Sequence, residues 1–274
     1  MTLGCRQGIA ALAIAALAAC GPPGPRGGPA GSPGQAQSQA GSSDTVEISA
    51  RGGQICVRSN GLPGHATGQF PNPGNPNRIS AQRIDVCVDA NPTKGPRPVA
   101  VQGSIGIAVN GVMIRPGTAD WYDASAPRGF SRDRSSGWNL EGMGAAEMLG
   151  LDQNNAHVDP RGLYHYHGIP TGLVPKMEDG LVGWAADGFP MYLADATRTA
   201  SWRLKSGQRP TAPFGAHDGT YVEDWVHVPG SGSLDQCNGG ERNGAYVYFV
   251  TDTFPFYPRC LWGEPSRDFR PPRR

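Results

Sequence analysis

The sequence has no marked excess of charge of either sign. Its 24 basic and 23 acidic residues leave a formal net charge of +1 over 274 residues, and only three of the basic residues are lysines. Proteins that bind nucleic acids gather Lys and Arg into a surface that neutralises phosphates. Here the basic residues are scattered along the chain, so we expect no nucleic-acid partner.

Long apolar stretches with helical spacing are also scarce. Instead, the chain contains 40 glycines and 26 prolines, about a quarter of all residues. This composition argues against a helical bundle, a coiled coil or a doubly wound α/β enzyme, because glycine and proline weaken or break helices. We therefore expect a mainly β fold: a single disulfide-stapled, loop-rich antiparallel domain, sandwich- or barrel-like, with one or two short helices.

Short β-like runs recur about every ten residues and are separated by turn signals. Asn110-Gly111, one of the strongest hairpin signals, separates runs at residues 104–109 and 112–114. One helix is expected at residues 140–149, which are rich in Ala, Glu and Met and are followed by Gly150. The other expected strands lie at residues 45–48, 54–58, 83–88, 180–185, 190–193 and 245–250.

The first twenty residues are typical of an export signal. The apolar stretch at residues 9–19 is too short to cross a bilayer as a stable helix. Residues 17–20 (LAAC) resemble the lipobox of bacterial lipoproteins, which implies cleavage after residue 19 and lipidation of the Cys20 thiol. The alternative is an ordinary secretory signal that leaves Cys20 free. We expect residues 1–19 to be a lipoprotein signal peptide and the protein to be lipid-anchored in the bacterial cell envelope. Because Gly21 rather than Asp follows the cysteine, we expect the anchor at the outer membrane if the cell has two membranes.

The next segment is expected to be a disordered tether that begins at the lipidated cysteine and covers residues 20–43. Residues 21–43 contain no aromatic or β-branched residue and cannot bury enough surface to fold. With the statistics of Gly-rich chains they span on the order of 25–30 Å. Residues 44–266 can bury one core, and residues 267–274 are interpreted as a frayed basic tail. The lipid is the only membrane contact expected, and the sequence does not identify a small-molecule or protein partner.

Cysteine usage agrees with export. One cysteine leaves with the signal and Cys20 takes the lipid, so an even number remains, which favours two disulfides in an oxidising compartment. Three connectivities are possible. We favour the sequence-local one, in which each bond closes a loop of roughly 25–30 residues and contributes about 3 kcal/mol. A four-cysteine metal site is the competing interpretation, but no Cys-x-x-Cys spacing is present. The favoured pairs are Cys56–Cys87 and Cys237–Cys260.

A histidine-rich segment follows a strong turn signal. Residues 159–162 (DPRG) have the residue types of a type I turn. If Gly162 adopts the left-handed conformation, the hairpin pairs residue 157 with residue 165. His165 and His167, about 6.5–7 Å apart along their strand, then share a face with His157. Tyr164 and Tyr166 point to the other face. A two-residue loop would instead pair 157 with 164 and separate the histidines.

Three neutral imidazoles on one face can hold Cu or Zn and leave a coordination position open. Asp187, at the end of an apolar strand, is a candidate fourth ligand or a partner that fixes a histidine tautomer; capping of its own turn is the alternative. Tyr164, Tyr166 and Asn155 are expected to support the ligands from behind. The competing interpretation is that the histidines are ordinary hydrogen-bonded residues of a hairpin. Calcium is a further possible cofactor, but Asp235, Asn238 and Glu241 lack the spacing of an EF-hand.

The segment at residues 162–167 (GLYHYH) resembles the YHYH domain, a group of exported, mostly bacterial proteins named for that tetrapeptide. The resemblance runs from about residue 105 to residue 263 and implies export but no particular activity. Two departures are an alanine at position 156, where the family often has glycine, and a second copy of the motif near the C-terminus that lacks its histidine. The matching blocks are VNGV at 109–112, AHVDP at 156–160, WAADGFP at 184–190, LDQCNG at 234–239 and FPFYPRC at 254–260.

Three functions remain compatible with these residues. The first is a binding module that holds Cu or Zn at the cell envelope. The second is a hydrolase or redox enzyme that uses the same metal with an open position, so whether the chain is an enzyme stays undecided. The third is a structural or adhesion lipoprotein without metal. The sequence has no Gly-x-Ser-x-Gly elbow, phosphate-binding loop, dinucleotide fingerprint or His-Glu-x-x-His helix. A second polar cluster, at residues 217–227, is expected to be a surface loop.

Overall fold

The computed structural model describes residues 43–270. The expected signal peptide, the expected lipidation site at Cys20 and nearly all of the expected tether lie outside the described residues, as do residues 271–274. The described chain is mainly β, as predicted, with several sheets and no closed barrel. Among these residues, no helix is both long and apolar enough to cross a membrane.

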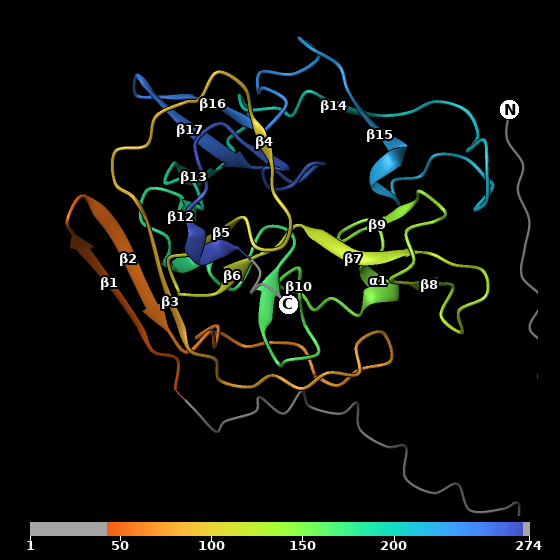
Figure 1. Cartoon of the computed structure of the whole chain (residues 1–274), viewed down its shortest axis with the longest axis horizontal. Helices are drawn as coiled ribbons and strands as arrows, with labels where there is room; N and C mark the ends of the chain where they lie inside the picture. Colours follow the sequence, from red (N-terminus) through yellow and green to blue (C-terminus); the bar gives the residue numbers. More distant parts are fainter. Residues whose placement is uncertain (1–42, 271–274) are drawn as a thin grey trace, which may run out of the picture. The chain divides into compact units, whose positions relative to one another are not determined.

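An eight-stranded sheet forms the centre of the domain (Figure 1). Two of its neighbouring pairs, β11 with β6 and β13 with β17, are parallel, so the sheet is mixed rather than purely antiparallel. Parallel neighbours need a crossover connection rather than a hairpin, and the long excursion between β6 and β11 supplies one. In spatial order the strands are β10 (Ala156–Val158), β11 (Tyr164–Tyr166), β6 (Met113–Ile114), β5 (Gly106–Ala108), β12 (Leu181–Ala185), β13 (Pro190–Leu193), β17 (Ala245–Val250) and β16 (Gly239–Arg242).

A three-stranded antiparallel sheet precedes the central sheet in the chain and consists of β1 (Val46–Arg51), β2 (Gln54–Ser59) and β3 (Ile84–Asp89). Alternate residues of β2 and β3, among them Val57 and Val88, are buried in the same hydrophobic cluster as the central strands. Cys56 lies directly opposite Cys87 in the register, and the two form a disulfide. This confirms the first predicted pair.

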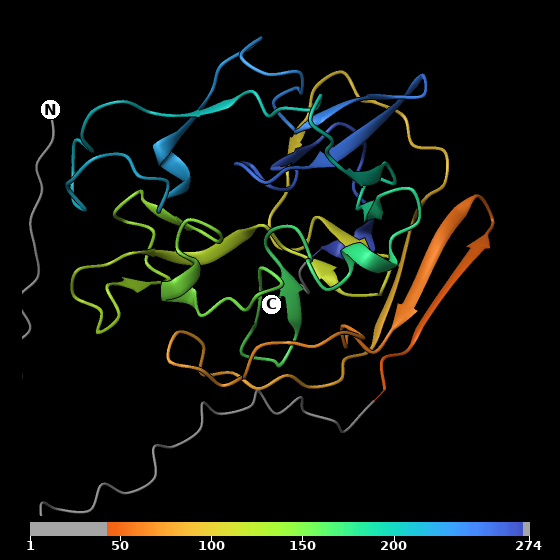
Figure 2. The ribbon, with the colours of Figure 1, turned by 180° about the vertical axis from the view of Figure 1, so that it is seen from behind.

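The excursion between β6 and β11 forms a second antiparallel sheet from β7 (Gly117–Tyr122), β8 (Phe130–Ser131) and β9 (Asn139–Glu141), followed by the short helix α1 (Ala146–Leu149). In both views of the ribbon this sheet lies on the opposite side of the central sheet from β1 and β2 (Figures 1 and 2). Trp138, Leu140 and Tyr221 form its own small core. The strands β10 and β11 lie between these two regions.

The remaining elements are short. The strand β18 (Cys260–Leu261) pairs with β4 (Val99–Ala100), and β14 (Trp202–Leu204) pairs with β15 (Trp225–His227). A disulfide joins Cys237 to Cys260, which confirms the second predicted pair. Three 3-10 turns complete the fold: η1 (Val174–Lys176), η2 (Val222–Asp224) and η3 (Arg267–Phe269).

Two predictions for individual segments need correction. The helix expected at residues 140–149 is confined to Ala146–Leu149, because the first residues of that window pair in β9 and two glycines, at 142 and 144, interrupt the helical pattern. Gly150 ends the helix, as predicted, and it adopts the left-handed conformation. The tail expected from residue 267 begins instead with η3, and Phe269 is buried in the main core.

Candidate metal centre

The hairpin of β10 and β11 has the predicted register. His157 pairs with His165, and the flanking residues 156 and 158 pair with 166 and 164. Gly162 has a positive φ of 86°, and its N–H donates to the carbonyl of Asp159 at 2.9 Å. The Asp159 carboxylate accepts hydrogen bonds from the N–H groups of Arg161 and Leu163, which closes the turn. The turn chemistry therefore sets the register that brings the three histidines to one face.

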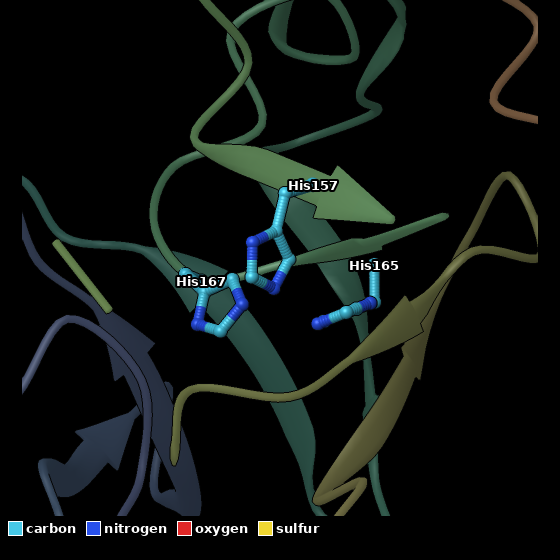
Figure 3. Close-up of side chains that lie close together, drawn as sticks. All are labelled: His157, His165 and His167. Atoms are coloured by element: carbon cyan, nitrogen blue, oxygen red, sulfur yellow. The ribbon is translucent and has the colours of Figure 1, made fainter. Parts of the chain in front are cut away.

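The imidazoles of His157, His165 and His167 converge (Figure 3). Their ring centroids lie 4.7 Å, 4.7 Å and 4.9 Å apart, and one nitrogen from each ring lies within 4.8 Å of the others. His165 and His167 are 2% and 1% exposed, whereas His157 is half-buried. Among residues 43–270, no other group of His, Cys, Asp or Glu side chains is gathered closely enough to hold a metal ion.

Hydrogen bonds to the backbone fix which nitrogen of each ring is free. A carbonyl oxygen can only accept, so each Nδ1 carries the proton and each Nε2 keeps its lone pair. Nε2 of His167 is buried and has no hydrogen-bond partner among the described residues. All three rings thus present the nitrogen that a metal would use. The Nδ1 contacts run from His157 to Leu149 at 2.9 Å, from His165 to Leu163 at 3.1 Å and from His167 to Pro116 at 3.4 Å.

Burial also keeps the rings uncharged. Loss of solvent lowers the pKa of His157 and lowers the pKa values of His165 and His167 well below the ordinary value. The charge of Arg115 lowers the pKa of His165 further, and the neighbouring His157 does the same for His167. Neutral imidazole is the form that ligates metals.

A buried ion pair braces His167 from behind. The carbonyl of Pro116 that accepts from His167 also accepts from Nη1 of Arg259 at 3.1 Å. Arg259 pairs with Glu141, whose other carboxylate oxygen accepts the N–H groups of residues 143 and 144. Gly142 packs against the ring so closely that a Cβ there would lie 2.3 Å from Nδ1 of His167. Sequence reasoning found Arg259 only as part of a family block and gave no signal for Glu141 or Gly142.

The tyrosines of the hairpin point away from the histidines. Tyr164 and Tyr166 are fully buried in the main core. The Tyr164 hydroxyl donates to Asp152 at 2.8 Å, and the Tyr166 hydroxyl lies within hydrogen-bond distance of His65 and accepts from the side chain of Asn110. They hold the strand in place and form no hydrogen bond with His157, His165 or His167.

Asn155 holds the backbone beside the three histidines. Its φ is +55°, and its carbonyl accepts the N–H of His167 at 2.8 Å. Its side-chain amide donates to the carbonyl of Ile169 at 2.8 Å. Asn155 therefore positions the main chain of His167 rather than its ring.

Asp187 belongs to a different network. Its carboxylate accepts the Tyr248 hydroxyl at 2.7 Å and the N–H of Gly263 at 2.9 Å, and burial raises the pKa of Asp187. It is not part of the three-histidine group. Asp235, near the second disulfide, accepts the Tyr246 hydroxyl and the indole N–H of Trp262, both at 2.8 Å.

The second polar cluster is not the surface loop that the sequence predicted. Asp224 is fully buried and accepts hydrogen bonds from Arg209 and His217. The His217 side chain is itself only 7% exposed. Burial alone would raise the pKa of Asp224, but the bonds from Arg209 and His217 lower it to about 2. The sequence of this cluster does not indicate that Arg209 binds the Asp224 carboxylate in the fold.

Comparison with known proteins places the chain in a family. The family described as YHYH protein matches residues 85–263, which is more than half of the chain, and the protein belongs to this family. The matched region includes the hairpin, both residues of the Cys237–Cys260 disulfide and Arg259. No curated protein and no solved structure matches the chain.

Proposed function

We propose that the protein is a lipoprotein of the bacterial cell envelope that binds a Cu or Zn ion through Nε2 of His157, His165 and His167. One observation carries the proposal: every Nδ1 is engaged by a backbone carbonyl, so three Nε2 lone pairs remain on converging rings, of which His165 and His167 are buried and His157 is half-buried. Nε2 of His167 is buried without a partner among the described residues, and this costs free energy. A bound metal ion would compensate that cost.

The donor set suits these two metals. Zn²⁺ and Cu²⁺ both bind neutral imidazole well, and zinc takes nitrogen ligands at about 2.0–2.1 Å. The three nitrogens already lie within 4.8 Å of one another, and the rings would move closer together to bind one ion. The carbonyls behind Nδ1 are the partners that usually orient metal-binding histidines. Three ligands from one hairpin leave a further coordination position for another group.

Binding is a better-supported role than catalysis. Asp187, which the sequence suggested as a fourth ligand or tautomer-fixing partner, is occupied by Tyr248 and Gly263 in a separate network. Envelope anchoring rests on the LAAC segment and on the tether, whose composition would hold the domain away from the lipid. A Cys20→Ser variant tests the anchor separately, since it should leave the membrane fraction.

Elemental analysis of the purified full chain tests the metal site. The protein is exported, extracted in detergent and purified without a polyhistidine tag, then loaded with Zn²⁺ or Cu²⁺ and desalted. We expect about one ion per chain, as for a single three-ligand site. The His165→Gln/His167→Gln double variant should lose it, because glutamine keeps the side-chain length but not the imidazole.

A matched control removes the same number of histidines elsewhere. The His217→Gln/His227→Gln variant should keep its metal, because neither residue belongs to the three-histidine group. Equal metal loss in both double variants, or no metal in the native protein after loading, would overturn the proposal and favour a structural role for the hairpin.

A further inference from the structure

A third strand contributes to the face that carries the histidines. In the central sheet β11 lies between β10 and β6. Met113 of β6 pairs with His165, and the next residues along, Ile114 and Tyr166, also pair. The N–H of Arg115 donates to the carbonyl of Tyr166, which continues the ladder by one residue and places Arg115 beside His167. Residues in register share a face, so Arg115 lies on the histidine side of the sheet.

Arg115 crosses this face from one side of the hairpin to the other. Its Nη1 donates to Asp159 at 3.2 Å. Asp159 follows β10 two residues after His157 and so shares its face. To reach Asp159 from β6, the Arg115 side chain passes over β11 beside His165.

One donor of Arg115 has no use in the fold. Its Nε–H is buried and lacks a hydrogen-bond partner among residues 43–270. Asp159 occupies Nη1 and is itself satisfied by Arg115, Arg161 and the turn backbone. An unmet buried donor is costly, and guanidinium groups are shaped to bind planar anions through two N–H groups.

The charges around the cluster favour an anion as well. Arg115 is balanced by Asp159, and Arg259 is balanced by Glu141. The three histidine ligands are neutral. A divalent ion would therefore add two positive charges to a largely buried site with no carboxylate ligand, and buried charge needs compensation.

We propose that the open coordination position takes a small carboxylate or inorganic oxyanion, with one oxygen on the metal and another accepting the Nε–H of Arg115. This inference rests on the proposed metal site. Binding is a ligand exchange in which the anion displaces a metal-bound water, and no bond within the anion is broken. The protein is then a receptor for a metal and an anion together.

Anion binding to the Co²⁺-loaded full chain tests this inference, because the visible spectrum of Co²⁺ reports directly on a change of ligand. Acetate is titrated in a non-coordinating buffer, with perchlorate holding the ionic strength constant so that screening does not change. We expect a saturable spectral change in the native protein and at least tenfold weaker acetate binding in Arg115→Gln. Inorganic phosphate, titrated in parallel, shows whether the site prefers a tetrahedral oxyanion or a planar carboxylate.

Two variants keep the result interpretable. Arg161→Gln removes the exposed arginine that contacts the same carboxylate, Asp159, at 3.4 Å, and should change acetate binding less than twofold. Arg115→Lys is the second variant, for use if Arg115→Gln folds poorly. It keeps the positive charge beside Asp159 but removes the planar guanidinium, so it should bind acetate more weakly than the native protein.

Reciprocal coupling gives a second readout. Acetate should tighten Co²⁺ binding by the same factor by which Co²⁺ tightens acetate binding. If Co²⁺ binds but acetate leaves the spectrum unchanged, or acts equally in the native and both Arg115 variants, the anion site is refuted and the metal site stands. Failure to bind any metal would refute both.

Discussion

Replacing Gly142 with alanine tests whether the fold behind the histidines sets the metal affinity. The added Cβ would lie 2.3 Å from Nδ1 of His167 and 2.8 Å from its Cγ. The backbone at Gly142 is not in the left-handed region, so alanine brings no conformational strain of its own. The perturbation is therefore a steric push on one ligand.

The size of the effect follows from these distances. Ordinary contact between such atoms is about 3.5 Å, so the ring must move by about 1 Å. Metal ligands keep their distances to within about 0.2 Å, and disturbing the groups behind a ligand typically costs 10- to 100-fold in affinity. We expect at least tenfold weaker Zn²⁺ binding in Gly142→Ala. Gly117→Ala is the matched control, because its Cβ would meet nothing within 4 Å.

Competition with a chromophoric zinc chelator measures both affinities. A double-mutant cycle then tests whether Gly142→Ala lowers the Zn²⁺ affinity by displacing His167. In a His167→Gln background, Gly142→Ala should cause no additional loss of Zn²⁺ affinity. Equal affinity in Gly142→Ala and the native protein would refute the reasoning. An equal loss of Zn²⁺ affinity in Gly117→Ala would also refute it. So would a double variant in which the affinity losses of Gly142→Ala and His167→Gln add in full.

Two further predictions test the surrounding structure. Because the pKa of Asp224 is lowered to about 2 in the fold and is near 3.8 when unfolded, its ionised form stabilises the protein above about pH 4 and that stability is lost as the pH falls towards 2. Denaturant unfolding between pH 5 and 2 should show a loss of about 1–2 kcal/mol that is absent in Asp224→Asn. Tyr166→Phe should cost about 1–2 kcal/mol, because His65 and Asn110 lose their hydroxyl partner, yet it should keep the full metal content, since Tyr166 faces away from the ligands. Calorimetry with elemental analysis checks both parts, and metal loss in Tyr166→Phe would contradict the register.

The parts of the site that the sequence could predict depend on local chemistry. The residue types at 159–162 specify the turn, and a left-handed Gly162 then fixes which residues face each other. Successive side chains of a strand point to opposite faces, so His165 and His167 lie on one face and Tyr164 and Tyr166 on the other. The disulfides were predictable for the same reason, because both close short loops in sequence.

The parts that the sequence could not predict depend on contacts between distant segments. Arg259 reaches Glu141 and Pro116 across more than a hundred residues of chain. The parallel pairing of β6 with β11, which brings Arg115 to the histidine face, has no local signal. The expected helix at 140–149 failed because tertiary pairing of β9 overrode the helical propensity of its first residues.

The alternation of tyrosine and histidine in β11 explains how the three-histidine cluster can form without a metal. Tyr164 and Tyr166 fill the core on one face, so the strand that carries His165 is held by apolar packing and not by the ion. The carbonyl that orients His157 belongs to Leu149, the last residue of α1, where helical carbonyls lack partners within the helix. Small zinc-dependent domains fold only with their metal. Here the packing, the carbonyls and two disulfides would preorganise the ligands, so the metal-free protein should fold and release of metal should leave the β-sheet intact.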